Sequence, residues 1–417
     1  KDLFPNGKRT YASFVQALPS DLIICVLIAL NNELNSNEET FDLQKRIFHA
    51  LTKRFTDKQK GELAKALSRF KVKTGGRYSG YIFGRRYLLA TIVKEFNNYR
   101  QCPDYVDNPL DEYNLLKAYL IAVDEVNLRD HTFIDFKKLN KTDPLTRYKL
   151  LWLPLLNQWE WNERVNIIFE TFKLLCFLKY VKVKYKKFLK EYLNGLDFKS
   201  IEQLLGSFNQ INKSTYIEDK NAVLRKLVYI APKSNAVQAH LRQQTINPRI
   251  GEEEITISDI RKFPLYYKDG RGYMTIDNAT YHKKNYRGPF FELRQNTSLK
   301  NEENFNTYST RWLTKGLNRL EKTCLSPILT LLSSSKADVL HFDDKTPSVP
   351  DGYIRIGNAI FLFEYKAYFF PETLTNDPEF GAIKKYIDKR FVKNERGKAK
   401  GISQLKAQIE ILNSKGF

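Results

Sequence analysis

Residues 351–368, with the sequence DGYIRIGNAIFLFEYKAY, constrain the fold more strongly than any other part of the chain. Two runs of apolar, β-branched and aromatic residues flank Gly357-Asn358, a dipeptide that suits a two-residue hairpin turn. A turn at that position pairs Ile356 with Ala359, and each further step outward pairs the next two residues. The segment is therefore predicted to form a β-hairpin with a defined register.

The predicted register carries two carboxylates to the same place. It sets Asp351 directly opposite Glu364, and Lys366, two residues further along, emerges on the same face of the sheet. Like charges opposite one another destabilise a sheet, so another charge must offset the repulsion. A divalent cation does so, and carboxylate oxygens suit Mg²⁺ or Mn²⁺. The alternative is a salt bridge from Lys366 alone, which stabilises only weakly when it is exposed.

The other face of the hairpin is almost wholly apolar, and we expect it to pack on helices. A helix is predicted over residues 313–328, a strand over 337–342 and a further helix over 401–412. The residues of the apolar face are Ile354, Ile356, Ala359, Phe361, Phe363 and Tyr365.

Pro350-Asp351, twelve intervening residues and then Glu364-Tyr365-Lys366 resemble the signature of the PD-(D/E)xK nucleases. The order of helix, strand, hairpin and helix around the motif strengthens the resemblance, which covers about residues 305–417. Pro103-Asp104, the other candidate start, has no partner motif in a hairpin. The resemblance implies a restriction-endonuclease-like α/β core, with a mixed sheet flanked by helices.

The resemblance also implies roles for the motif residues. Asp351 and Glu364 are expected to ligate Mg²⁺, with Mn²⁺ able to substitute, and the backbone carbonyl of Tyr365 joins them. Lys366 is expected to orient or help deprotonate the attacking water and to stabilise charge at the phosphate. The metal polarises the phosphate and lowers the pKa of its water.

Two helices are expected to supply further site residues, again by resemblance. Glu321 is the candidate metal ligand from the preceding helix, and its alternative is an ordinary exposed helical glutamate. Gln404 is the candidate catalytic residue from the following helix, with Gln408 one turn later. The tyrosine that accompanies this glutamine in the RecB-like branch is not visible, so the chain is not assigned to that branch. The long insert at residues 369–400, with its basic run, is interpreted as a substrate clamp or a disordered loop.

The charge of the chain indicates a polyanionic partner. Lysine and arginine number 68 against 47 acidic residues, which gives a formal charge of +21 and a pI near 9.5. Nucleic acid is the usual partner of such a chain, and an anionic membrane surface is the other. The apolar run at residues 22–30 is too short to span a bilayer, so a buried helix and no membrane span are expected.

The cysteines and histidines exclude the common zinc centres. Four scattered cysteines form no CxxC pair, and the five histidines form no HExxH arrangement. A disulfide framework is not expected either, which favours a cytoplasmic location.

Residues 1–210 are predicted to be a helical, basic region that binds nucleic acid or a protein partner. Residues 174–192 read as one helix in which lysines alternate with aromatic residues, and residues 71–86 read as a glycine-rich basic loop. Each segment has an alternative as an ordinary solvated surface. The candidate nucleic-acid contacts in these segments are Lys182, Lys186, Lys187, Arg85 and Arg86.

Residues 211–304 are predicted to be a mixed, β-rich connecting region. Residues 254–258 and 264–276 alternate like strands, with Asp269-Gly270 as the turn within the second segment. Residues 280–294 are basic and aromatic, which suggests either a nucleic-acid contact or an ordinary hairpin edge.

The predicted fold class is therefore α+β and multidomain, with a nuclease domain at residues 305–417. The predicted function is metal-dependent phosphodiester hydrolysis, with DNA favoured over RNA because of the family resemblance. The alternative is a non-catalytic nucleic-acid-binding or partner-regulated subunit of a larger complex. The abundance of lysine, asparagine, isoleucine and tyrosine suits an AT-rich bacterial genome, so antiviral defence or a mobile-element system is the expected setting.

Overall fold

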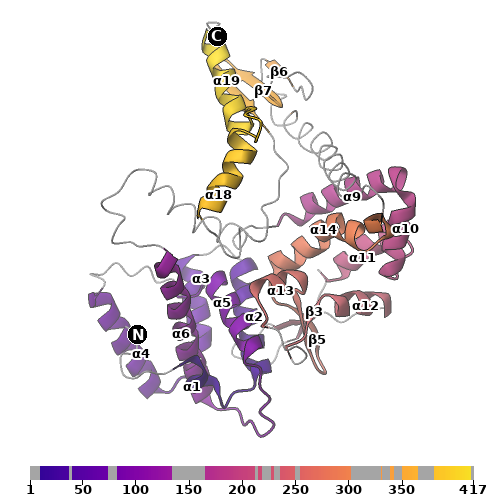
Figure 1. The fold of residues 1–417 in the computed structure, drawn as a ribbon. Helices are drawn as coiled ribbons and strands as arrows, with labels where there is room; N and C mark the ends of the chain where they lie inside the picture. The colour runs from indigo at the N-terminus through magenta and orange to yellow at the C-terminus, as the bar shows by residue number, and fades with distance from the viewer. Residues whose placement is uncertain are drawn as a thin grey trace. The chain divides into compact units, whose positions relative to one another are not determined.

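The described part of the chain is a mixed α/β structure that is mainly helical, with one two-stranded and two three-stranded sheets (Figure 1). The computed structural model describes residues 10–36, 40–73, 82–133, 165–211, 215–217, 227–229, 235–248, 254–301, 330, 339–341, 350–364 and 380–414.

The chain divides into two compact units, each assembled from two stretches of sequence. Residues 1–165 and 196–288 form the first unit, and residues 166–195 and 289–417 form the second. The predicted boundaries at residues 210 and 304 assumed continuous segments, whereas both units are discontinuous.

The first unit begins with helices whose apolar faces form one core, drawn in indigo and purple in Figure 1. Helix α2 packs on α5, and α1 packs on α6. The core continues into the later part of the unit through Ile260, Tyr266 and Met274. The helices are α1 (Tyr11–Val15), α2 (Ser20–Ser36), α3 (Phe41–Thr52), α4 (Asp57–Lys73), α5 (Arg85–Asn97) and α6 (Pro109–Phe133).

The apolar run at residues 22–30 is a buried helical segment of α2, as predicted. Ile23, Ile24 and Leu27 are at most 1% exposed. No helix in the described part of the chain is long and apolar enough to cross a membrane.

The rest of the first unit combines short strands with helices. It comprises α11 (Ile201–Ile211), β1 (Thr215–Ile217), β2 (Leu227–Tyr229), α12 (Asn235–Gln243), β3 (Thr245–Ile246), α13 (Ile257–Lys262), β4 (Leu265–Lys268), β5 (Gly272–Thr275) and the first part of α14 (Asn278–Gln295).

The predicted hairpin at residues 264–276 is confirmed. Strands β4 and β5 pair antiparallel, and Gly270 adopts a φ of 72°, which a glycine tolerates at a tight turn. Strand β3 joins the sheet on the other side of β4 in parallel.

Two β-structure predictions for this region are wrong, whereas the alternative of a nucleic-acid contact at residues 280–294 stays a prediction. Residues 254–258 do not form a strand, because Thr256 and Asp259 build a capping box that starts α13 at Ile257. Residues 280–294 form most of α14 rather than a hairpin edge. The buried oxygen of Asp277 accepts a hydrogen bond from the Thr280 backbone at 2.7 Å, which caps the start of that helix.

The second unit contains a helical part and a part with a sheet. The helical part consists of α9 (Ile167–Lys184), α10 (Lys186–Gly195), the end of α14 and the 3₁₀ turn Ser298–Asn301. The part with the sheet contains β6 (Val339–His341), β7 (Gly352–Ile356), β8 (Ala359–Phe363), α18 (Phe380–Ile387), the π-helical turn Asp388–Val392 and α19 (Gly401–Ser414).

Strands β6, β7 and β8 form a three-stranded sheet in that order, and both pairings are antiparallel. The predicted first strand, the hairpin and the following helix are therefore present. The predicted mixed sheet is not seen among the strands that the structure describes here. Residues 313–328, predicted as the preceding helix, lie outside the described residues.

Candidate functional site

The register of the β7–β8 hairpin is the predicted one. Gly352 pairs with Phe363 at the open end, and Ile356 pairs with Ala359 next to the turn. Gly357 adopts a φ of 56°, the left-handed conformation that a hairpin turn of this kind requires.

Asp351 directly precedes β7 and Glu364 directly follows β8, so both lie next to the Gly352–Phe363 pair. The next step of the register sets them opposite one another, and both side chains are half-buried. The two predicted carboxylate ligands therefore flank the last observed pair of the hairpin. Lys366, Tyr365 and Glu321 lie outside the described residues.

The donor set of this hairpin end fits a hard divalent cation. Mg²⁺ is commonly held by one or two carboxylates, with water and substrate phosphate oxygens completing its octahedron. Two carboxylates on neighbouring strands supply that protein share. The described residues contain no group of three or more acidic, histidine or cysteine side chains with metal-binding geometry.

The apolar face of the hairpin is only partly covered, which corrects the prediction that all of it packs on helices. Ile354 is 6% exposed, whereas Ile356 and Phe361 are 39% and 48% exposed. Two large apolar side chains on this sheet therefore remain in contact with solvent.

Gln404 has a structural role that the motif did not predict. Its side-chain oxygen accepts a hydrogen bond from the backbone of Gly401 at 2.8 Å, at the first turn of α19. Gly401 adopts a φ of 36°, and a Cβ there would lie 3.2 Å from the Phe391 carbonyl oxygen. Gln408, the alternative candidate, is the buried glutamine of this helix, at 5% exposure.

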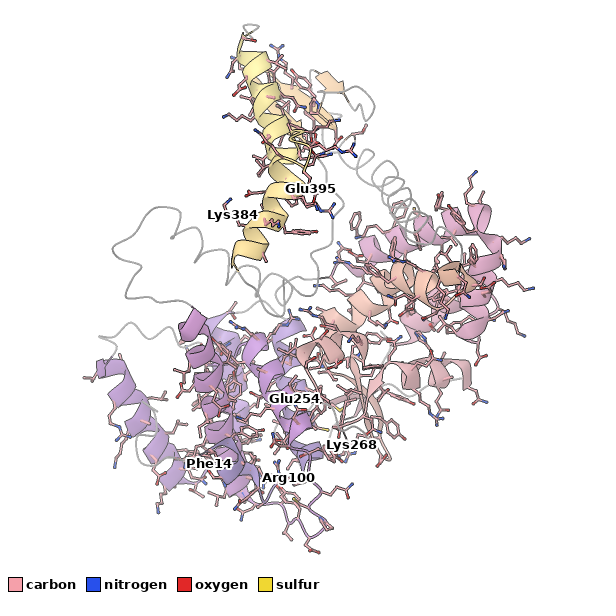
Figure 2. The ribbon with its side chains drawn as sticks, in the orientation of Figure 1. Phe14, Arg100, Glu254, Lys268, Lys384 and Glu395 are labelled. Carbon is pink, nitrogen blue, oxygen red and sulfur yellow. The ribbon has the colours of Figure 1, made fainter. Side chains whose placement is uncertain are left out.

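The basic insert contains regular structure between residues 380 and 400, so it is not a disordered loop over that stretch. Lys384 forms an ion pair with Asp388 at 2.5 Å, and Lys389 forms one with Glu395. Figure 2 labels Lys384 and Glu395 in this stretch. The pairing lowers the pKa of the Glu395 carboxyl, chiefly through the hydrogen bond from Lys389. Three further cations are exposed around the turn that follows: Lys393, Arg396 and Lys398.

The lysine-rich segment at residues 174–192 is two helices rather than the single helix predicted. Tyr185 separates α9 from α10, with φ and ψ of −142° and 41°. Lys182, Lys186 and Lys187 are all exposed around this break, and Lys187 lies 4.0 Å from Glu191.

The packing of these two helices explains why their lysines face solvent. The apolar residues of α10 are buried on the opposite face, and Phe177 of α9 stacks on Phe290 with ring centroids 4.0 Å apart. Glu191 accepts hydrogen bonds from the Ser298 backbone and hydroxyl at 2.7 and 2.8 Å, and the backbone bond is the main cause of its lowered pKa. The exposed lysines are thus mounted on an ordered surface.

The assignment of Arg85 to a nucleic-acid contact needs correction. Its side chain is 10% exposed, and Nη2 donates to both oxygens of Asp277, at 3.0 and 2.7 Å. Asp277 is fully buried and also accepts from Asn31 at 3.0 Å. Arg85 therefore neutralises a carboxylate in the core, and its neighbour Arg86 is half-buried.

The predicted basic loop at residues 71–86 is likewise shorter than expected. Lys71 to Lys73 belong to α4, and Arg85 and Arg86 open α5. Residues 74–81 lie outside the described residues.

One pocket in the first unit was not anticipated from the sequence. It has a volume of about 350 Å³ and lies beside β3 and the β4–β5 turn. Only its turn, Asp269-Gly270, carried a sequence signal, and that signal indicated a hairpin rather than a binding site.

Comparisons with models of known protein families, with curated proteins and with solved structures find no match for this chain.

Proposed function

We propose that this protein is a metal-dependent nuclease that hydrolyses phosphodiester bonds, with DNA as its substrate. The observation that supports this most directly is the hairpin register, which carries Asp351 and Glu364 to one end of β7 and β8. Like charges in such positions are stabilised by a divalent cation, and Mg²⁺ suits their oxygens.

Each of the three charged motif residues then has a defined role. Asp351 and Glu364 hold the cation, which polarises the phosphate and lowers the pKa of a bound water when it is present. Lys366, two residues beyond Glu364, orients that water and stabilises the charge that develops at the phosphate. This assignment for Lys366 rests on the motif.

The basic surfaces supply attraction for a polyanion. The lysines at the α9–α10 break and the cations around residues 393–398 are exposed in the unit that also contains the hairpin. Contacts of this kind bind phosphates without reading sequence, and their strength falls steeply with salt.

Cleavage of supercoiled and linear DNA by the purified chain tests the proposal. Mg²⁺ or Mn²⁺ should support cutting, EDTA should abolish it, and Asp351→Asn, Glu364→Gln and Lys366→Ala should each remove it. Glu410→Gln is the matched control, because Glu410 is an exposed carboxylate on α19 of the same unit. Equal cutting by the wild type and all three site variants would refute the proposal.

A second candidate function is a subunit that acts only within a complex. The exposed apolar side chains of the same unit favour it, since solvent-facing Phe361 and Ile356 on the sheet and Ile402 on α19 suit a protein partner. In that case the isolated chain binds DNA and does not cut it until the partner is added.

A further inference from the structure

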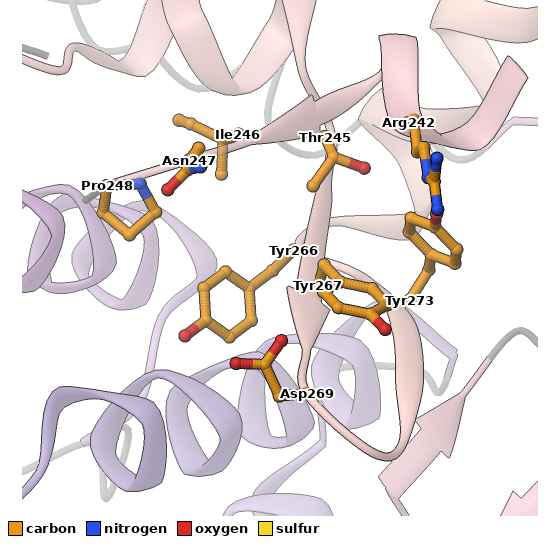
Figure 3. Close-up of a pocket in the computed structure, with 9 residues that line it drawn as sticks. All are labelled: Arg242, Thr245, Ile246, Asn247, Pro248, Tyr266, Tyr267, Asp269 and Tyr273. Carbon is orange, nitrogen blue, oxygen red and sulfur yellow. The ribbon is translucent and has the colours of Figure 1, made fainter. Parts of the chain in front are cut away.

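The pocket of the first unit is formed where strand β3 ends beside β4. Strand β3 pairs with β4 only at Leu265 and Tyr266 and stops at Ile246. Beyond that point the described residues place no strand along this edge of β4, although Tyr267 and Lys268 still pair with β5 on the other side. The resulting recess is lined by Arg242, Thr245, Ile246, Asn247, Pro248, Tyr266, Tyr267, Asp269 and Tyr273 (Figure 3).

The pocket contains one open aromatic surface on a rigid support. Tyr267 is 44% exposed, and its ring lies 5.0 Å from that of Tyr273, its cross-strand partner. Tyr273 is 2% exposed, and Tyr266, also 2% exposed, donates its hydroxyl to Asp21. The buried ring of Tyr273 thus supports the exposed ring of Tyr267, whereas Tyr266 packs in the core on the opposite face of the strand.

Charges of opposite sign flank this aromatic surface. Figure 3 shows Arg242 on one side of Tyr267 and Asp269 on the other. Arg242, in the last turn of α12, is exposed, and the described residues offer it no carboxylate partner. The pocket therefore presents a cation, then a planar apolar face, then a carboxylate acceptor.

We propose that this pocket binds a single nucleotide unit, with guanine favoured over the other bases. Arg242 holds the phosphate through charge-assisted hydrogen bonds. The base stacks on Tyr267, as bases do on aromatic side chains that bind single strands. Asp269 accepts hydrogen bonds from the far edge of the base, and guanine offers a carboxylate two adjacent N–H donors there.

A pocket of about 350 Å³ lies in the range of small-molecule sites. The same chemistry fits a free nucleotide or one unit of a single-stranded nucleic acid. The site belongs to the first unit and the hairpin to the second, so this binding does not depend on the proposed hydrolysis.

Calorimetric titration of the full chain in EDTA tests the proposal. The probes are GMP, UMP, guanosine and a short single-stranded oligodeoxynucleotide that contains one guanine. GMP should saturate the site and bind more tightly than UMP. Saturation by GMP identifies a free nucleotide as a ligand, and saturation by the oligonucleotide alone identifies a strand.

Variants separate the parts of the site. Tyr267→Ala should weaken GMP and guanosine by at least about tenfold, because it removes the stacking surface. Arg242→Ala should weaken GMP by roughly tenfold and leave guanosine unchanged, because only GMP carries the phosphate. Asp269→Asn should reduce the preference for GMP over UMP.

Matched controls keep the outcome interpretable. Phe41→Ala and Arg69→Ala remove an exposed aromatic ring and an exposed arginine elsewhere in the same unit, and both should bind GMP like the wild type. Asp351→Asn should also bind GMP normally, whatever it does to cleavage. No saturation by GMP or oligonucleotide, or wild-type binding by both Tyr267→Ala and Arg242→Ala, would overturn the proposal.

Discussion

Removal of the Arg85 guanidinium is expected to lower the free energy of unfolding by several kilocalories per mole. From the sequence, this residue was predicted to contact nucleic acid. Asp277 is fully buried and accepts hydrogen bonds from Arg85, Asn31 and the Thr280 backbone. An Arg85→Met variant removes the guanidinium that forms an ion pair with this buried carboxylate. Breaking a buried pair in this way costs about 3–5 kcal/mol.

A comparison pair sets the scale for this effect. Arg46 and Glu33 form an ion pair at 3.4 Å, but their side chains are 65% and 43% exposed. An exposed pair contributes about 0–1 kcal/mol, so Arg46→Met should change the free energy of unfolding very little.

A double-mutant cycle isolates the buried interaction. Asp277→Asn keeps a side-chain oxygen at the start of α14 while removing the charge that Arg85 neutralises. The double variant Arg85→Met with Asp277→Asn should therefore recover part of the stability that Arg85→Met loses. Urea denaturation followed by circular dichroism measures all four proteins.

A free energy of unfolding for Arg85→Met within about 1 kcal/mol of the wild type, the range expected for Arg46→Met, would refute a stabilising role of the buried ion pair. That role is also refuted if the double variant loses the sum of the two single effects, because the side chains would then act independently.

Three further outcomes follow from the same structure. Burial lowers the pKa of His282 to about 4 in the folded protein, and the nearby Asp277 carboxylate offsets only part of this shift. In the unfolded chain the pKa of this histidine is near 6.5. The unfolded chain therefore binds more protons between these values, so stability should fall as pH drops from about 6.5 towards 4, and His282→Gln should flatten that part of a melting-temperature profile. Gly401→Ala should lower the melting temperature, because Gly401 combines a positive φ with a close approach to the Phe391 carbonyl, whereas Ala407→Gly on the exposed part of α19 should lower it less. Alanine at all three exposed lysines of the α9–α10 surface should weaken DNA binding. The slope of log affinity against log salt concentration, measured by fluorescence anisotropy, should fall by the equivalent of up to about three phosphate contacts. An unchanged slope would exclude this surface as a DNA contact. These lysines are Lys182, Lys186 and Lys187.

Local signals predicted the parts of the fold that are decided locally. The turn residues Gly357 and Asn358 and the alternation around them predict a register whose five pairs from Gly352–Phe363 to Ile356–Ala359 are present in the structure. The β4–β5 turn followed from Asp269-Gly270 for the same reason. In both hairpins the strands are neighbours in sequence, so no distant contact was needed.

Other features depended on contacts that the sequence does not display. Arg85 and Asp277 are 192 residues apart, and nothing near either residue identifies the other as its partner. Residues 280–294 carry aromatic residues that suit a strand, yet the capped start at Asp277 and the burial of Tyr281 and Tyr286 make them helical.

In the candidate site too, some features follow from the local sequence and others depend on contacts that the sequence does not display. The predicted positions of Asp351 and Glu364 follow from the hairpin register, one step beyond its last observed pair. The capping role of Gln404 depends on the backbone conformation of Gly401, which a motif comparison does not contain. The exposure of Phe361 depends on which helices cover the sheet, and alternation along a strand does not determine this.

Direct measurement of metal binding tests the central claim without requiring turnover or an activating partner. Electron paramagnetic resonance of Mn²⁺ titrated into the chain should reveal one saturable site, which Asp351→Asn and Glu364→Gln each abolish and Glu410→Gln preserves. Equal Mn²⁺ binding by the wild type and both hairpin variants would contradict the proposal that these carboxylates hold the catalytic cation.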